Sequence, residues 1–289
     1  MNFERETIIA LVRDALVEAG STFRADKKAA YARAIANETD EKAKWVLETI
    51  LENAEAAEKD RAPLCDDTGI PHLLLEVGQE AAVSGYMLDA IREGVAEGLR
   101  KLPGRPMGIM GEDSQRIDQS GGLDPDSAGV KPAPILLRSC EEPVVRLHIL
   151  MFGGGPAIRA RTYRVFHKHD TQVVLDEIVH WATEGVAQLG CSPCTLAVGI
   201  GRSHFEAAAM MLQAQADGRY DVQSPMEQEI TQRVNEADIG PLGLHGKTSV
   251  LATFLKVGPQ RASGVRIVCV RPTCCFEPRI ATVELWKKE

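Results

Sequence analysis

Three cysteines at three separate turns carry the chemistry that this chain could perform. Cys65 opens Cys-Asp-Asp-Thr-Gly, Cys191 opens Cys-Ser-Pro-Cys, and Cys275 closes Pro-Thr-Cys-Cys. Three thiolates brought together from distant loops can hold an iron–sulfur cluster in which one iron has no protein ligand. An open metal ion is a Lewis acid and assists the departure of a hydroxyl group. The three cysteines therefore predict the chemistry of a dehydratase.

The first of these turns combines a thiolate, two carboxylates and a hydroxyl within residues 65–69. A purely structural alternative is an Asx-turn or a helix cap, in which Asp66, Asp67 and Gly69 serve the backbone. The adjacent cysteine favours a functional site over this alternative.

The C-x-x-C pattern of the second turn leaves two other uses open. A thioredoxin-like redox motif would be followed directly by a helix, whereas residues 195–200 have the apolar pattern of a strand. A zinc site is possible on ligand count, with Cys191, Cys194, Cys274 and Cys275 as ligands. Adjacent cysteines are poor tetrahedral co-ligands, but a zinc-stabilised binding or scaffold protein without catalytic activity is the alternative function.

Two glycine-rich segments could face an anion, but both depart from the nucleotide-binding patterns. Residues 199–201 lie between an expected strand and an expected helix, where N–H groups can bind an anion. The third glycine of a dinucleotide fingerprint is replaced by His204. Residues 246–248 read Gly-Lys-Thr, but Pro241 stands where a phosphate-binding loop has its first glycine. A nucleotide-binding function is therefore disfavoured.

The triple glycine at 153–155 follows an expected strand and permits a close approach of the backbone to another group. The structural alternative is a tight turn. Arg159 and Arg161 follow it and could bind a carboxylate through a bidentate fork, although an exposed ion pair is the commoner use of such a residue.

In their order along the chain, these segments resemble the iron–sulfur hydro-lyases of the class I fumarase and L-tartrate dehydratase family. The part of the family that they resemble is the alpha subunit, or N-terminal cluster-binding domain, and the resemblance spans residues 60 to 281. It is carried by Cys-x-Asp-Thr-Gly, the triple glycine, Cys-x-Pro before Val-Gly-Ile-Gly, Ile-Gly-Pro-Leu-Gly-Leu, Gly-Lys-Thr, and a late Cys followed by an aromatic residue and an Arg.

The resemblance implies a 4Fe–4S cluster whose free iron binds the hydroxyl and carboxylate of the substrate. Its ligands would be Cys65, Cys191 and Cys275. Cys274 is a rival for the third position, and Cys275 is preferred because Phe276 and Arg279 follow it as an aromatic residue and an Arg follow the family cysteine.

The reaction implied is the reversible dehydration of a small 2-hydroxy carboxylic or dicarboxylic acid, such as tartrate or malate/fumarate. Asp67 and Thr68 are the expected catalytic residues. The expected substrate-binding residues are Asp66, Arg105, Gly154, Gly155 and Arg161. Stabilising a dianionic intermediate requires fixed positive charge and N–H donors, which this set offers.

Three departures from the family pattern bear on the substrate and on the partner. The family has a histidine before the third cysteine, whereas residues 260–263 read Gln-Arg-Ala-Ser here, and the loop 103–131 lacks the usual Asn-Thr-Gly element. The residues after the triple glycine look more like tartrate dehydratases than fumarases. Because the chain ends soon after the third cysteine, we expect a separate beta subunit to complete the site, in a dimer of such heterodimers.

The composition excludes several other classes of function. The net charge of −8 argues against nucleic acid or an anionic membrane as the main partner. The first residues lack the basic and apolar regions of a secretory signal, and no apolar run reaches the roughly 18 residues of a membrane span. We therefore expect a cytoplasmic protein whose seven cysteines are reduced or bind metal.

The elements that must position these residues predict an α+β fold, with a helical N-terminal portion (1–60) packed on a mixed sheet (61–289) in a single domain over 1–289. Apolar periodicity predicts helices at 8–20, 26–59 with a break near Asn37, 83–102, 171–188, 203–217 and 225–238. It predicts strands at 72–77, 133–138, 144–151, 195–200, 248–256, 264–270 and 279–286. The loop 103–131 shows no periodicity, and loops this long are usually functional or mobile.

Overall fold

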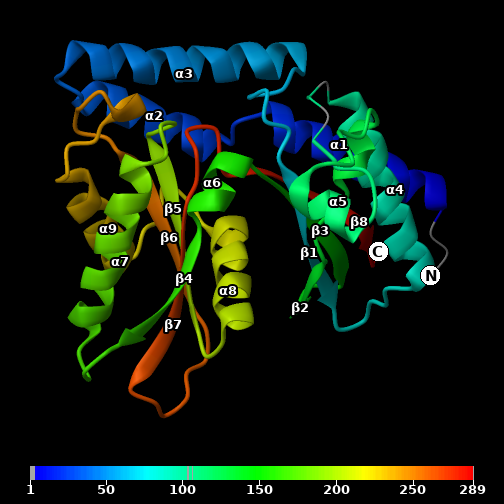
Figure 1. The fold of residues 1–289 in the computed structure, drawn as a ribbon. Helices are drawn as coiled ribbons and strands as arrows, with labels where there is room; N and C mark the ends of the chain where they lie inside the picture. Colours follow the sequence, from blue (N-terminus) through cyan, green and yellow to red (C-terminus); the bar gives the residue numbers. More distant parts are fainter. Residues whose placement is uncertain (1–3, 103, 106, 289) are drawn as a thin grey trace. The chain divides into compact units, whose positions relative to one another are not determined.

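A computed structural model of the chain describes residues 4–102, 104–105 and 107–288 (Figure 1). Pro103 and Pro106 of the predicted loop therefore lie outside the described part. Helices and two mixed four-stranded sheets confirm the predicted α+β class. The chain divides into two compact units: unit 1 is Met1–Thr22, Ala54–Phe152 and Arg279–Glu289, and unit 2 is Phe23–Asn53 and Gly153–Pro278. A single hydro-lyase domain over 1–289 stays a prediction.

Unit 1 is built on a sheet with the strand order β2-β1-β3-β8. β1 (Ile70–Gly78) runs parallel to β2 (Leu136–Cys140) and antiparallel to β3 (Val144–Phe152), and β3 pairs with β8 (Arg279–Lys287). Side chains two residues apart share one face of a strand. The face formed by Leu73, Leu75, Leu147 and Ile149 is buried with residues of α1 (Arg5–Ser21) and α4 (Gly85–Lys101).

Unit 2 contains the sheet β4-β7-β5-β6. Its strands are β4 (Arg161–Phe166), β5 (Cys194–Gly201), β6 (Val250–Val257) and β7 (Val265–Pro272). Leu196 and Val198 pack with α7 (Thr171–Ala187) and α9 (Pro225–Asn235). On the opposite face, a Cβ at Gly199 would stand 2.1 Å from the backbone of Ala207 in α8 (His204–Asp217), so the backbones of β5 and α8 approach closely. The sheet therefore lies between α8 and the pair α7 and α9 (Figure 1).

The N-terminal portion is helical as predicted, and its helices are shared between the units. The predicted break near Asn37 is confirmed, because α2 (Ala25–Asn37) ends there and α3 (Glu41–Asp60) begins after it. In unit 2, Ala30 of α2 packs with a small apolar cluster formed by Ala214, Tyr220, Ala252 and Phe254. The boundary between the units falls inside α3.

Most of the predicted helices and strands are present, but two elements after the triple glycine were missed. Residues 154–159 form the short helix α6 (Gly154–Arg159), and β4 follows it. β4 has one buried residue, Val165, so its sequence lacks the apolar alternation of a half-buried strand. The predicted loop 103–131 contains the helix α5 (Asp113–Asp118) and a 3₁₀ turn at 127–130. Among the described helices, none has the length and apolar character that crossing a bilayer requires.

Candidate active site

Two of the three predicted cluster ligands are neighbours in unit 2. The N–H of Cys275 donates a hydrogen bond of 2.8 Å to the carbonyl oxygen of Cys191. Cys191 is exposed in the turn before β5, and Cys275 is buried in the segment after β7. None of the seven cysteines, all of which lie in the described part of the chain, forms a disulfide. The fold thus brings the second and third predicted ligands together from segments that are far apart in the sequence.

The surroundings of Cys275 disfavour its thiolate. The hydrogen bond with Cys274 and burial raise the pKa of the Cys275 thiol well above its usual range, while the cation of Lys27 opposes this shift. A coordinated metal ion reverses such a preference, because a coordinating thiol is deprotonated outright. Thiolates are the ligands that iron–sulfur clusters and zinc select. The donor set therefore fits a metal centre of this class.

The two other cysteines near this pair differ in exposure. Cys194 is fully buried at the start of β5, and burial raises the pKa of its thiol, as expected of an inert core cysteine. Cys274 is half-buried beside Cys275, so both residues stay candidates for the third ligand. Within either unit, the described residues contain no three His, Cys, Asp or Glu side chains grouped closely enough to hold one metal ion.

The turn of Cys65 lies in unit 1 and is held by its own side chains. Oδ1 of Asp67 accepts a hydrogen bond of 3.1 Å from the N–H of Gly69, which is the Asx-turn named as the structural alternative. The buried hydroxyl of Thr68 donates a hydrogen bond of 2.9 Å to the carbonyl oxygen of Arg105. Both side chains therefore stabilise the turn, and their catalytic role stays a prediction.

The same turn brings two predicted substrate-binding residues together. Nη1 of Arg105 lies 3.2 Å from Oδ2 of Asp66, and both side chains are exposed. Exposed ion pairs contribute little to stability, so this guanidinium can exchange its partner for a substrate carboxylate at small cost. Cys65, with its thiol 3.6 Å from Oδ1 of Asp66, completes a polar cluster on one turn.

The main chain of this turn is hydrogen-bonded by Arg279, a residue that the sequence analysis named only as part of the family motif. Arg279, the first residue of β8, is buried, and its Nη1 donates a hydrogen bond of 2.8 Å to the main-chain oxygen of Asp67. The guanidinium of Arg279 therefore contacts the main chain of the predicted catalytic aspartate, Asp67.

The remaining predicted substrate-binding residues lie in unit 2. Gly154 and Gly155 form the first turn of α6, with nothing within 4 Å of a Cβ placed on Gly155, so the backbone there is open. Arg161 begins β4, and its Nη1 donates a hydrogen bond of 3.1 Å to the hydroxyl of Tyr163, which raises the pKa of the guanidinium. Nη1 of Arg161 also lies 4.0 Å from Oε2 of Glu184. Its place in a substrate site stays a prediction.

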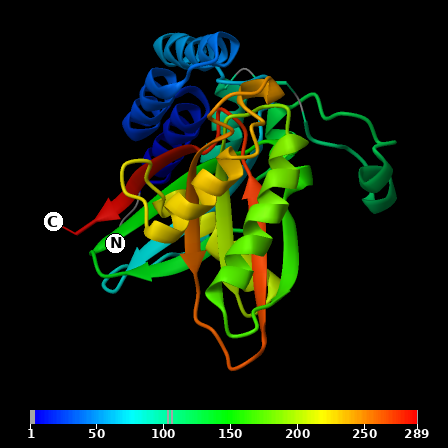
Figure 2. The same cartoon turned by 90° about the vertical axis from the view of Figure 1, so that its left-hand side faces the viewer.

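The segment that replaces the family histidine lies far from the two neighbouring cysteines. Nε2 of Gln260 donates a hydrogen bond of 2.9 Å to the carbonyl oxygen of Gly258. The N–H of Gly258 in turn donates one to the carbonyl oxygen of Ile200, near the C-terminal end of β5. Cys191 precedes the N-terminal end of the same strand, and an eight-residue strand is roughly 25 Å long. Figure 2 shows the connection from β6 to β7, in orange, at that far end of the sheet.

The sequence analysis missed one buried ion pair next to Cys275. Nη1 of Arg271 lies 2.5 Å from Oε2 of Glu277, and the two residues are 1% and 0% exposed. Charged residues are rarely buried completely unless they are paired. The available signal was their position within otherwise apolar segments, the end of β7 and the residue before Pro278.

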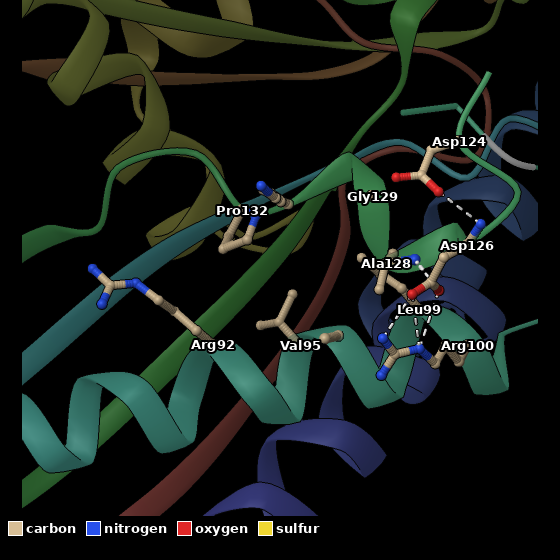
Figure 3. A pocket seen from close by; sticks show the side chains of 11 residues that line it. Arg92, Val95, Leu99, Arg100, Asp124, Asp126, Ala128, Gly129 and Pro132 are labelled. Atoms are coloured by element: carbon tan, nitrogen blue, oxygen red, sulfur yellow. Dashed lines mark hydrogen bonds and ion pairs between the residues drawn. The ribbon is translucent and has the colours of Figure 1, made fainter. Parts of the chain in front are cut away.

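Unit 1 also has a pocket of about 500 Å³ on α4 (Figure 3). Val95 and Leu99 contribute apolar lining, and at one end Nη2 of Arg100 lies 2.7 Å from Oδ2 of Asp126. None of the predicted site residues is among its lining residues, so this pocket is separate from the turn of Cys65.

Comparisons with known proteins agree with the resemblance that the motifs suggested. The family model described as fumarate hydratase (Fumerase) matches residues 9–284. A protein of Methanocaldococcus jannaschii, provisionally named L(+)-tartrate dehydratase subunit alpha, is 25% identical in an alignment of length 288 that covers 96% of this chain and 95% of the relative. The L(+)-tartrate dehydratase subunit alpha of Escherichia coli K12 is 22% identical in an alignment of length 254 that covers 85% of this chain and 80% of the relative. That of Shigella boydii gives the same identity and coverage.

Proposed function

Because the chain belongs to the fumarate hydratase (Fumerase) family, we propose that it is the cluster-bearing alpha subunit of an iron–sulfur hydro-lyase. The reaction would be the reversible dehydration of a small 2-hydroxy dicarboxylic acid. Tartrate is the first candidate substrate, since the relatives from three organisms carry the name of a tartrate dehydratase subunit. The observation that carries the proposal is the contact between Cys191 and Cys275, two thiol residues adjacent in space within the family-matched region.

Cys65, Cys191 and Cys275 would hold a 4Fe–4S cluster, and the bound cluster would supply a Lewis-acidic iron for the hydroxyl that leaves. Around it, Arg105 would bind one substrate carboxylate in place of Asp66, its exposed partner. The N–H groups of Gly154 and Gly155 would stabilise the charge that develops on the other carboxylate. Thr68, bonded to the main chain of Arg105, would keep that guanidinium at the turn.

Asp67 is the carboxylate that we assign to the reacting part of the substrate. Its main-chain oxygen is fixed by Arg279 and its Oδ1 by the N–H of Gly69, so the side chain is pre-organised. A pre-organised carboxylate can orient the substrate without reorganisation at the moment of reaction.

A separate subunit would complete the active site. The relatives that this chain resembles are named alpha subunits, and a subunit of that kind has at least one partner. We propose a beta subunit that supplies proton-transfer groups, with two such heterodimers forming the complete enzyme.

Metal analysis of anaerobically purified protein tests the proposal directly. A brown protein with about four irons and four sulfides per chain is expected. A colourless protein with one zinc per chain would instead support the zinc-stabilised scaffold, for which Cys191, Cys194, Cys274 and Cys275 all lie in unit 2. Dehydration of tartrate and malate by the protein together with its beta subunit then identifies the substrate.

A further inference from the structure

The buried carboxylate of Glu277 joins two segments to which the proposed function gives separate roles. Oε1 accepts a hydrogen bond from the N–H of Gly153, and Oε2 lies 2.5 Å from Nη1 of Arg271. Glu277 follows Cys275 by two residues, and Gly153 directly precedes the two glycines proposed to bind substrate. One side chain therefore connects the thiol segment to the glycine turn.

The main chain of the same segment is fixed from the other side by α2. Nζ of Lys27 donates a hydrogen bond of 2.8 Å to the carbonyl oxygen of Glu277, and the hydroxyl of Tyr31 donates one of 2.8 Å to the carbonyl oxygen of Cys275. Residues four apart on a helix lie on the same face, so both side chains reach the segment together. The N–H of Cys275 also donates a hydrogen bond to Cys191. Cys275 and Glu277 are therefore both hydrogen-bonded to segments that are distant in the sequence.

Stability alone is a weak reason to bury this ion pair. Glu277 and Arg271 are 0% and 1% exposed, and taking two charges out of water costs nearly as much as their attraction returns. A pair of apolar side chains of the same volume would stabilise this core as well. What the carboxylate supplies in addition is a directional link between Gly153, Arg271 and the Cys275 segment.

We propose that Glu277 is a positioning residue that fixes the Cys275 thiol relative to the N–H groups of Gly154 and Gly155. This inference rests on the proposed function, in which the Cys275 thiol would hold the cluster and those N–H groups would bind the substrate on which the cluster acts. A displacement of about 1 Å between groups that act together can cost a hundredfold in rate. Arg271 orients the carboxylate and neutralises its charge, so that both oxygens keep their partners.

Glu277→Gln tests this role, and Glu76→Gln is its matched control. Glu76 is also a buried carboxylate bonded to two arginines, Arg138 at 2.8 Å and Arg146 at 3.0 Å, but it lies in unit 1 outside the proposed machinery. Both variants break a buried ion pair and should lower the melting temperature. Only Glu277→Gln is expected to release iron to a chelator about tenfold faster and to raise KM about tenfold, the usual effect of losing an outer-shell partner.

Amide hydrogen exchange gives a readout that does not depend on the cluster. Exchange of the peptides that contain Gly153–Ala157 and Cys275–Glu277 should accelerate at least tenfold in Glu277→Gln and stay unchanged in Glu76→Gln. Equal protection of these peptides in the two variants would overturn the inference, whether or not iron is bound. Wild-type protein without iron would instead overturn the proposed function, while the exchange result still decides the role of Glu277.

If Glu277→Gln does not fold, the double variant Arg271→Met/Glu277→Met removes the uncompensated charge together with the acceptor for Gly153. This variant is expected to fold and to show fast exchange at Gly153–Ala157. Protection equal to that of the wild type would contradict the positioning role.

Discussion

Arg279 and Asp67 are joined by a hydrogen bond of 2.8 Å from the guanidinium Nη1 to the main-chain oxygen. The bond attaches the turn of Cys65 to the first residue of β8, and Nη2 of the same guanidinium occupies the space beside Gly69. A Cβ at Gly69 would lie 2.4 Å from this nitrogen and 3.0 Å from the carbonyl oxygen of Phe152. Gly69 also has φ of +79°, in the left-handed region. The buried arginine and the backbone thus both require glycine at this position.

Gly69→Ala is expected to destabilise the protein, because the left-handed conformation alone costs an L-residue about 1–2 kcal/mol. The contact with Arg279 adds to this cost. Gly85→Ala is the control: Gly85 begins α4 and nothing lies within 4 Å of its Cβ position, so alanine there should be neutral or slightly stabilising. Urea unfolding of both variants measures the difference, and equal stability would contradict the requirement for glycine.

Tyr31→Phe removes the donor that contacts the carbonyl oxygen of Cys275. Tyr31 is fully buried, so leaving that carbonyl without this partner should cost about 1–3 kcal/mol of unfolding free energy. Tyr86→Phe, at a side chain that is 56% exposed, should change the free energy by less than about 0.5 kcal/mol. A loss that is the same for both tyrosines would show that this bond does not stabilise the Cys275 segment.

Serine variants of the cysteines separate ligands from bystanders. Cys65→Ser and Cys191→Ser should lose iron, sulfide and visible absorbance, whereas Cys140→Ser and Cys269→Ser should keep them, because Cys140 lies on β2 and Cys269 inside β7. Full iron content in Cys65→Ser would remove that residue from the ligand set. Comparing Cys274→Ser with Cys275→Ser then assigns the third ligand.

The stability that Glu76 contributes should disappear in acid. Burial alone raises the pKa of Glu76, but hydrogen bonds from Arg138 and His148, with the charges of both, bring it below its ordinary value. A carboxylate with a lowered pKa stabilises the folded state above its unfolded pKa, about 4.3, and loses this effect as pH falls through the folded value. Arg146 also faces Glu76, at 3.0 Å, and binds Glu142 and Glu284 as well.

Glu76→Gln measures this contribution. The variant should be less stable than the wild type by up to about 3 kcal/mol at pH 7. The difference should shrink progressively as pH falls below about 4.3 and through the lowered pKa of the folded carboxyl, because the wild-type side chain then becomes protonated as well. A difference that does not change with pH would show that the charge of Glu76 is not the stabilising feature.

The helices and strands that could be predicted from the sequence are those with a clear apolar period or stop signal. Helix α1, strand β1 and the break after Asn37 have clear apolar periods or stop signals, and they occur as predicted. The strand β4 was missed because it has one buried residue, Val165, and its arginines obscure the alternation of an edge strand. Apolar periodicity depends on how many residues of a segment are buried, so a helix or strand with few buried residues is hard to predict from it.

For the candidate site, the order of the motifs identified residues but not their partners. The motifs named Cys191 and Cys275, and the fold places them in contact. The apolar segments around Arg271 and Glu277 were a signal of their burial, but no local pattern indicated that the two side chains would pair with each other. Contacts between distant segments depend on tertiary structure, which one sequence does not reveal.

The interleaving of the two units has a consequence for synthesis on the ribosome. The chain passes between the units at 22/23, 53/54, 152/153 and 278/279, and the segment Gly153–Pro278 of unit 2 separates β8 from its partner β3. Domains usually fold in the order in which they are made, N-terminal first. Here the sheet of unit 1 lacks β8 along one edge until the segment Gly153–Pro278 of unit 2 has been made, so unit 1 cannot be completed before unit 2 has been synthesised.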